Sequence, residues 1–150
     1  MPRKLPADIR EQVRRRADYL CEYCHINERW QYVHFTIDHL TPSAGGGEET
    51  PENLALACFH CNRRKSDKQS GVDRLTGLTV PLFNPRSQQW REHFVWSSDG
   101  LRIVPLTAIG RATVELLELN RERVLRIRAA DVEVRRHPPK GDLVQRTDQS

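Results

Sequence analysis

The chain has 150 residues, a length that suits one domain or a small core with an appended element. Charged residues make up 29% and hydrophobic residues 37%, and three Trp, four Phe and three Tyr allow a packed core, which excludes general disorder. Lysine and arginine total 24 against 20 acidic residues, a net charge of +4 that permits an anionic partner without identifying one.

The first half of the chain predicts a helix, two strands and a second helix. Residues 6–20 have apolar positions at helical spacing, beginning at Pro6. Residues 33–38 alternate, which predicts a strand with Val33, Phe35 and Ile37 on its buried face. A glycine-rich loop follows over residues 41–47, and the short apolar run 54–57 is interpreted as a return strand. Residues 62–68 then predict a basic helix.

The second half predicts a loop, a hairpin and two helices. Gly77, Pro81 and Pro85 indicate a loop segment. The apolar runs 93–96 and 101–106 flank an Asp-Gly turn, a good hairpin signal. We expect Trp90, Phe94 and Trp96 in the core rather than on a base-stacking surface. Residues 107–136 predict two helices with a cap at Thr107 and a break near Asn120, and residues 140–150 predict a frayed tail.

Four cysteines form two CxxC pairs: Cys21, Cys24, Cys58 and Cys61. No apolar run approaches the ~18 residues of a membrane span, and the start of the chain lacks the apolar stretch of a secretory signal. We therefore expect a cytoplasmic protein with no membrane partner, in which thiols stay reduced. Two CxxC pairs supply four thiolates that can converge on one tetrahedral Zn²⁺. The matched pairs favour a structural zinc site over two separate redox dithiols.

Three polar residues lie where such a zinc site would bring them together. Asp38 ends the predicted strand, His39 is its neighbour, and Asn62 directly follows the last cysteine. A carboxylate and a carboxamide together suit a hard divalent cation such as Mg²⁺. Adjacent strand residues point to opposite faces, so Asp38 can bind a cation while His39 faces another part of the site. A neutral imidazole there is a suitable general base for water at neutral pH.

These residues, in this order and spacing, resemble the HNH endonuclease family. The resemblance rests on the two CxxC pairs, Asp38-His39, Gly46-Gly47, Asn53-Leu54, and Asn62 followed by Lys65. It covers about residues 17–68, under half of the chain. The family has a ββα-metal (His-Me finger) core. The resemblance therefore implies an α+β fold in which that core, with its zinc-bound CxxC knuckles, is preceded by a helix and followed by a β-hairpin and C-terminal helices.

The resemblance also implies a role for each site residue. His39 would activate the attacking water, while Asp38 and Asn62 would hold one catalytic Mg²⁺ or Mn²⁺. Asn53 would brace the loop that orients the base, and the four cysteines would hold a structural zinc away from the reaction. The family's third letter is usually a histidine and here it is Asn62. The site is thus an H-N-N variant, similar to the subgroup that contains phage junction-resolving nucleases.

The extent of the resemblance suggests three regions. We expect residues 1–75 to form the HNH nuclease core with its structural zinc. Residues 76–137 would form a β-hairpin and a helical extension, and residues 138–150 a flexible tail. Short segments at 81–86 and 110–113 resemble the tails of stand-alone bacterial HNH proteins.

Basic residues gather on the helix expected after the second CxxC pair: Arg63, Arg64, Lys65 and Lys68. We expect them to contact DNA phosphates, which positions a duplex without reading its sequence. Two further arginine groups, within 10–16 and 121–128, are explained as well by solvated helix faces. The sequence thus predicts a metal-dependent DNA endonuclease, a phosphodiester hydrolase. The alternative is a non-catalytic, zinc-stabilised nucleic-acid-binding module, which gives no reason for the placement of Asp38, His39 and Asn62.

Overall fold

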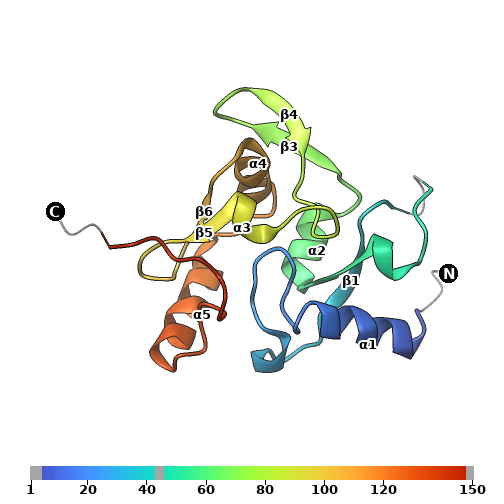
Figure 1. Cartoon of the computed structure of the whole chain (residues 1–150), viewed down its shortest axis with the longest axis horizontal. Coiled ribbons are helices and arrows are strands. Elements are labelled where there is room, and N and C mark those ends of the chain that lie inside the picture. The colour runs from blue at the N-terminus through green and yellow to red at the C-terminus, as the bar shows by residue number, and fades with distance from the viewer. Residues whose placement is uncertain (1–4, 43–45, 148–150) are drawn as a thin grey trace. The chain divides into compact units, whose positions relative to one another are not determined.

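A computed structural model describes residues 5–42 and 46–147 and shows an α+β protein built from helices and short antiparallel strand pairs (Figure 1). The fold class expected from the sequence is confirmed. The chain divides into two compact units. Unit 1 comprises Met1–Gln69 and Asn84–Ser87, and unit 2 comprises Ser70–Phe83 and Gln88–Ser150. The region boundaries predicted at residues 75 and 137 stay predictions.

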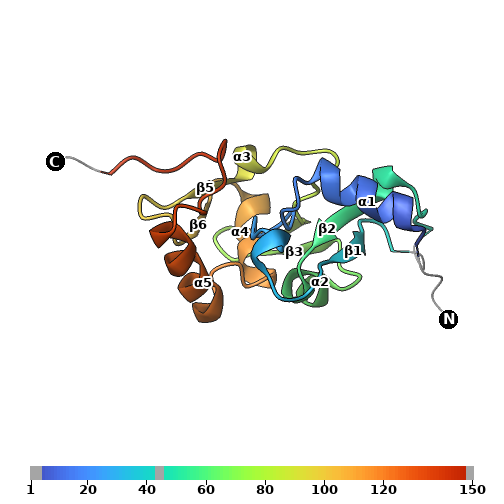
Figure 2. The same cartoon turned by 90° about the horizontal axis from the view of Figure 1, so that it is seen from below.

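Unit 1 contains a strand–strand–helix arrangement. Its elements in chain order are α1 (Ala7–Arg16), the 3-10 turn η1 (Glu28–Trp30), β1 (Thr36–His39), the 3-10 turn η3 (Pro51–Asn53), β2 (Leu54–Ala57) and α2 (Phe59–Lys65). Strands β1 and β2 are antiparallel, with His39 opposite Leu54. The view of Figure 2 shows α1 beside β2. The return strand interpreted from residues 54–57 is thereby confirmed.

The core of unit 1 is built around β2. All four β2 side chains are buried, and the strand contacts α1, β1 and α2. Arg16 at the end of α1 fastens this packing, because its guanidinium donates to the main-chain carbonyls of Pro51 at 2.8 Å and Leu54 at 2.6 Å. Further buried side chains complete the core: Val13, Tyr23, Phe35, Leu40 and the four cysteines.

The first helix and first strand of unit 1 are shorter than the sequence predicts. Helix α1 ends at Arg16 rather than at residue 20, because Asp18 and Tyr19 adopt left-handed φ angles of 51° and 60° that turn the chain toward the first CxxC pair. Strand β1 begins at residue 36. Val33 is 59% exposed instead of buried, and the Phe35 N–H donates to the Glu28 carboxylate at 2.6 Å rather than to a neighbouring strand.

The basic helix lies three residues earlier than predicted, over Phe59–Lys65 rather than 62–68. Its N-cap is Cys58, whose Sγ accepts a hydrogen bond from the Cys61 N–H at 3.4 Å. It ends where Ser66 adopts a φ of 52°. The second CxxC pair therefore belongs to the first turn of this helix.

Unit 2 contains two hairpins and three helices: β3 (Ser70–Asp73), β4 (Leu78–Pro81), α3 (Trp90–His93), β5 (Phe94–Trp96), β6 (Ile103–Pro105), α4 (Ala108–Leu116) and α5 (Glu122–Glu133). The predicted hairpin is confirmed, with Trp96 of β5 opposite Ile103 of β6. The two predicted helices are also confirmed. Thr107 caps the first, since its Oγ1 accepts from the Gly110 N–H at 3.0 Å.

An aromatic cluster forms the core of unit 2. The ring of Trp90 lies 5.1 Å from that of Phe94 and 5.6 Å from that of Trp96. These side chains are buried, as expected, and do not form a base-stacking surface. Arg128, within the last arginine group, is 2% exposed and donates to the main-chain carbonyls of Leu101 and Leu119. At that position the solvated-face interpretation is wrong.

Two segments of unit 2 differ from the prediction. The segment of Gly77 and Pro81, expected as a loop, belongs to the β3–β4 hairpin seen in Figure 1. Its turn is stabilised by Asp73, whose carboxylate accepts from Thr76 Oγ1 at 2.8 Å and whose two oxygens accept from Nε and Nη2 of Arg111. In the segment expected to fray, Leu143 O accepts from Trp96 N–H at 3.0 Å, and residue 145 donates back to Trp96 O.

Among the described residues, no helix combines the length and apolarity needed to cross a bilayer.

Candidate active site and metal centre

The four cysteines converge on one point in unit 1. Their Sγ atoms lie within 4.8 Å of one another, all four side chains are buried, and none forms a disulfide. The Cys24 and Cys58 sulfurs are 3.8 Å apart. A tetrahedral zinc with Zn–S bonds of ~2.3 Å requires sulfur–sulfur edges of about 3.8 Å, so the cluster fits this ion. Burial, followed by the hydrogen bonds that the thiol forms with Cys24 and Cys58, raises the pKa of Cys21, and a bound cation would reverse that effect.

Each CxxC pair is shaped by local main-chain hydrogen bonds. In the first, Cys21 N–H donates to Ile26 O and His25 N–H donates to Cys21 O, both at 2.9 Å. His25 follows with a φ of 60°, which closes the turn. In the second, Cys58 occupies the N-cap of α2. The cluster of four cysteines is thus assembled from a tight turn and a helix N-terminus.

A cavity of about 500 Å³ lies beside β1 and α2. It brings together three residues selected from the sequence: Asp38 and His39 at the end of β1, and Asn62 in α2. The remaining lining residues are Ile37, Pro42, Arg63, Ser66 and Asp67. The sequence reasoning did not identify Ser66 or Asp67 as part of this site.

Asp38 is held from two sides. It is 3% exposed, and its Oδ2 accepts a hydrogen bond from Tyr23 OH at 2.6 Å. Lys65 Nζ forms an ion pair with the same oxygen at 3.1 Å. Burial and the nearby Asp38 charge raise the pKa of Tyr23 well above its usual value, so its phenol stays a donor. Lys65 is itself 3% exposed, so the expectation that it contacts DNA phosphates is wrong.

His39 presents a ring nitrogen without a partner. Its side chain is 28% exposed, but Nε2 is buried and has no hydrogen-bond partner among the described residues. Oε1 of Glu49 lies 3.7 Å from Nε2, within ion-pair range but beyond hydrogen-bond distance. Glu49 follows the glycine-rich loop and carries no sequence signal that relates it to His39. The imidazole thus lines the cavity, with a buried Nε2 that forms no hydrogen bond to the described residues.

Asn53 fastens the chain that follows His39. Its Oδ1 accepts from Thr41 N–H at 2.8 Å, and its Nδ2 donates to Thr41 O at 3.0 Å and Glu48 O at 2.8 Å. A Cβ at Gly47 would lie 1.7 Å from Thr41 O, so only glycine fits this approach. Part of the loop, residues 43–45, lies outside the described residues. These contacts support the role predicted for Asn53 without testing it in catalysis.

The basic residues of α2 divide into two kinds. Arg63 and Arg64 are exposed, as is Lys68 just beyond the helix, and Arg63 also lines the cavity. Lys65 points inward instead, because it lies four residues after the buried Cys61 and therefore on the same helix face. Three of the four residues expected to contact DNA thus remain at the surface.

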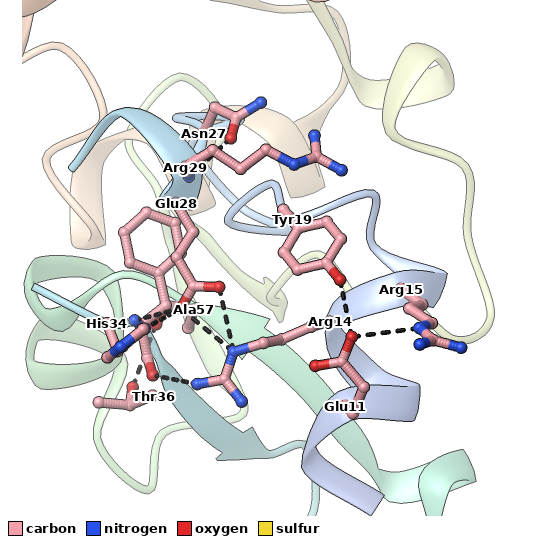
Figure 3. A network of polar contacts seen from close by, with 11 residues as sticks. Glu11, Arg14, Arg15, Tyr19, Asn27, Glu28, Arg29, His34, Thr36 and Ala57 are labelled. Carbon is pink, nitrogen blue, oxygen red and sulfur yellow. Dashed lines mark hydrogen bonds and ion pairs between the residues drawn. The ribbon is translucent and has the colours of Figure 1, made fainter. Parts of the chain in front are cut away.

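The arginines of α1 differ in their surroundings, since the Arg14 side chain is largely buried while that of Arg15 is exposed. Figure 3 shows Arg14 donating to the buried carboxylate of Glu28, at 3.0 Å. Arg14 also donates to the main-chain carbonyl of Phe35, just before β1, at 3.3 Å. In the same view Tyr19 OH donates to Glu11 at 2.7 Å, and Arg15 donates to that carboxylate at 3.1 Å. For Arg14 the solvated-face interpretation is therefore wrong.

Residues 21–68 match the family described as HNH endonuclease. The matched segment contains both CxxC pairs and every residue that lines the cavity. The resemblance drawn from the sequence is confirmed for this segment. No curated protein and no solved structure matches the chain.

Proposed function

We propose that this chain, whose residues 21–68 match the HNH endonuclease family, is a divalent-cation-dependent endonuclease that hydrolyses phosphodiester bonds in DNA. The observation that carries the proposal is the cavity that gathers Asp38, His39 and Asn62 within that segment. A general base and two oxygen donors facing one space are the groups that metal-assisted phosphodiester hydrolysis needs.

His39 acts as the general base. Its imidazole accepts a proton from water at the cavity, and the water oxygen forms a bond to phosphorus. The bond between phosphorus and the 3′ oxygen breaks, and that oxygen takes up a proton from solvent. The products are a 5′ phosphate and a 3′ hydroxyl. Asn53 keeps the imidazole in place through the loop contacts described above.

Asp38 and Asn62 would hold the divalent cation. A carboxylate and a carboxamide are hard oxygen donors, which fit Mg²⁺ or Mn²⁺. Because Oδ2 of Asp38 is engaged by Tyr23 and Lys65, Oδ1 is the oxygen that would face the cation. When bound, the cation supplies positive charge next to the phosphate and the departing 3′ oxygen.

DNA would lie against the exposed side of α2. Arg63, Arg64 and Lys68 supply positive charge there, and Arg63 reaches the cavity itself. Contacts of this kind hold the phosphate backbone in register and make binding dependent on salt concentration. The four-cysteine zinc site holds α2 against the strands and takes no part in the reaction.

One observation favours a second candidate, a non-catalytic zinc-stabilised nucleic-acid-binding module. Asp38 already has a positive partner in Lys65, so the acid is not left unpaired when no divalent cation is bound. Such a module would bind DNA through α2 without cutting it. The two candidates differ in one measurable property, cleavage in the presence of Mg²⁺ or Mn²⁺.

The test is plasmid nicking by the purified zinc-loaded chain, with Mg²⁺ or Mn²⁺ added to divalent-free buffer. His39→Ala should lower the rate by ~10²-fold or more while zinc content and circular dichroism stay unchanged. His34→Ala is the matched control, because His34 is 92% exposed and does not line the cavity. Equal nicking by the His39 variant would falsify the base assignment. If the unsubstituted chain binds DNA but cuts none, the binding module is the correct function.

A further inference from the structure

Three side chains from separate elements meet behind the proposed cation site. Tyr23 comes from the first CxxC pair, Asp38 from β1 and Lys65 from α2. All three are buried, with Tyr23 fully so and the other two 3% exposed. The phenol at 2.6 Å and the ammonium at 3.1 Å both contact Oδ2 of Asp38. Oδ2 of Asp38 is therefore occupied by contacts with Tyr23 and Lys65.

The ammonium of Lys65 depends on this carboxylate. Among the described residues, Nζ has no hydrogen-bond partner besides its ion pair with Asp38. A buried charge without a partner is strongly destabilising, so each of the two groups requires the other when no further ion is present. The pair has no net charge, and the other two charged lining residues, Arg63 and Asp67, are of opposite sign. The charged groups at the cavity therefore carry no surplus negative charge of the kind that usually attracts a divalent cation.

We propose that Lys65 is a resident counter-cation of Asp38, which keeps divalent-cation binding weak until a DNA phosphate enters the cavity. The inference rests on the proposed function, because it takes Asp38 as a cation ligand. A divalent cation and the Lys65 ammonium repel each other while sharing one carboxylate. A phosphate adds negative charge and offsets that repulsion. Lys65 is thus a positioning residue that makes cation binding depend on substrate.

The experiment measures Mn²⁺ affinity by titration calorimetry on the zinc-loaded chain without DNA. Lys65→Met removes the charge at similar length and should tighten Mn²⁺ binding by at least about tenfold. Lys65→Arg keeps the charge and should bind Mn²⁺ as weakly as the unsubstituted chain. Lys68→Met is the matched control on an exposed lysine and should change the affinity less than about twofold. Unchanged or weaker Mn²⁺ binding by Lys65→Met overturns the proposal.

A second arm tests the dependence on substrate in the non-cleaving His39→Ala background. A short duplex should raise the Mn²⁺ affinity of this protein by at least about tenfold, and the gain should shrink when Lys65→Met is added. No gain with duplex contradicts the substrate dependence. Asp38→Asn separates this inference from the proposed function. If that variant binds Mn²⁺ like the unsubstituted chain, the cation site itself is wrong, whatever Lys65 does.

Removal of the ammonium could also unfold the chain, because Asp38 would then be buried without a positive partner. In that case the readout is recovery of the folded circular dichroism spectrum on adding Mn²⁺. Recovery by Lys65→Met, but not by the double variant that also carries Asp38→Asn, supports the proposal. Failure of Mn²⁺ to restore the fold contradicts it.

Discussion

Replacing Asn53 with alanine would remove the three hydrogen bonds by which its carboxamide holds the loop after His39. Two of these bonds involve the main chain of Thr41 and one involves Glu48 O, at 2.8–3.0 Å. Partly buried neutral hydrogen bonds contribute about 0.5–1 kcal/mol each. The free energy of opening this loop should therefore fall by about 2 kcal/mol in Asn53→Ala. That corresponds to an approximately 30-fold change in the opening equilibrium.

Amide hydrogen exchange followed by NMR can measure this loss at single residues. Thr41 N–H donates to the Asn53 side chain, so its protection should fall by about 30-fold. Leu40 N–H donates to the main-chain carbonyl of Asn53 at 2.9 Å, which alanine retains, so its protection should change by less than about threefold. The two neighbouring amides thus report on the side chain and on the backbone separately.

Asn27→Ala is the matched control for this substitution. Its Oδ1 accepts from Arg29 N–H at 2.8 Å in another turn of unit 1, so Thr41 exchange should not change. Unchanged protection of Thr41 in Asn53→Ala would refute the reasoning, because the side-chain bonds would then contribute nothing. An equal fall at Leu40 and Thr41 would also refute it, since the loop would be opening as part of a larger unfolding.

Two further predictions concern stability. Arg16→Ala loses the two bonds from its guanidinium to main-chain carbonyls at 2.8 and 2.6 Å and should lower the free energy of unfolding by about 2 kcal/mol, measured by urea-induced zinc release. Arg15→Ala, on the same helix, removes only an exposed ion pair and should have no measurable effect, so equal losses would contradict this account. Burial lowers the pKa of His137, so folded protein binds a proton less readily than unfolded protein, and stability should fall as pH drops below about 6.5. His137→Gln should weaken this pH dependence of stability. The part due to His93 should remain, because burial also lowers the pKa of His93. A pH profile of the melting temperature that is unchanged in His137→Gln would show that His137 does not cause the dependence.

The sequence predicted the parts of the site that depend on local spacing. The CxxC pairs, the short return strand and the start of a helix after Cys58 follow from residue order within a few positions. The structure confirms the cysteine cluster and places Asp38, His39 and Asn62 at one cavity. Local sequence patterns predict these features because turns and helix caps are determined by residues that are neighbours in the sequence.

The contacts of Asp38 could not be predicted in the same way. Tyr23 and Lys65 lie far from it in sequence, and alternation along the strand placed Asp38 on its less buried face. One signal was available for Lys65, since it lies four residues after Cys61 and hence on the inward face of α2. A basic residue on a short helix was nevertheless interpreted as a surface contact, because lysines are rarely buried without a partner.

The β3–β4 hairpin was missed for a different reason. Val72 and Leu78 are more than half exposed, so the strands lack the apolar–polar alternation that identifies one buried face. The hairpin forms because its turn is closed by Asp73 and because Arg111 of α4 pairs with that carboxylate. Gly77, taken as a sign of irregular structure, supplies the positive φ of 76° in the turn.

The route of the chain through its two units has a consequence for synthesis on the ribosome. Arg86, from the short segment that returns to unit 1, pairs with Glu22, whose carboxylate accepts from Leu56 N–H at 2.8 Å. Burial raises the pKa of Glu22, and the charge of Arg86 opposes that rise. A nascent polypeptide that has emerged only to residue 69 does not yet contain Arg86. We therefore expect unit 1 to form this ion pair only after the β3–β4 hairpin and Arg86 have been translated. A fragment excised at residue 69 would carry all four clustered cysteines and still lack the Arg86–Glu22 ion pair.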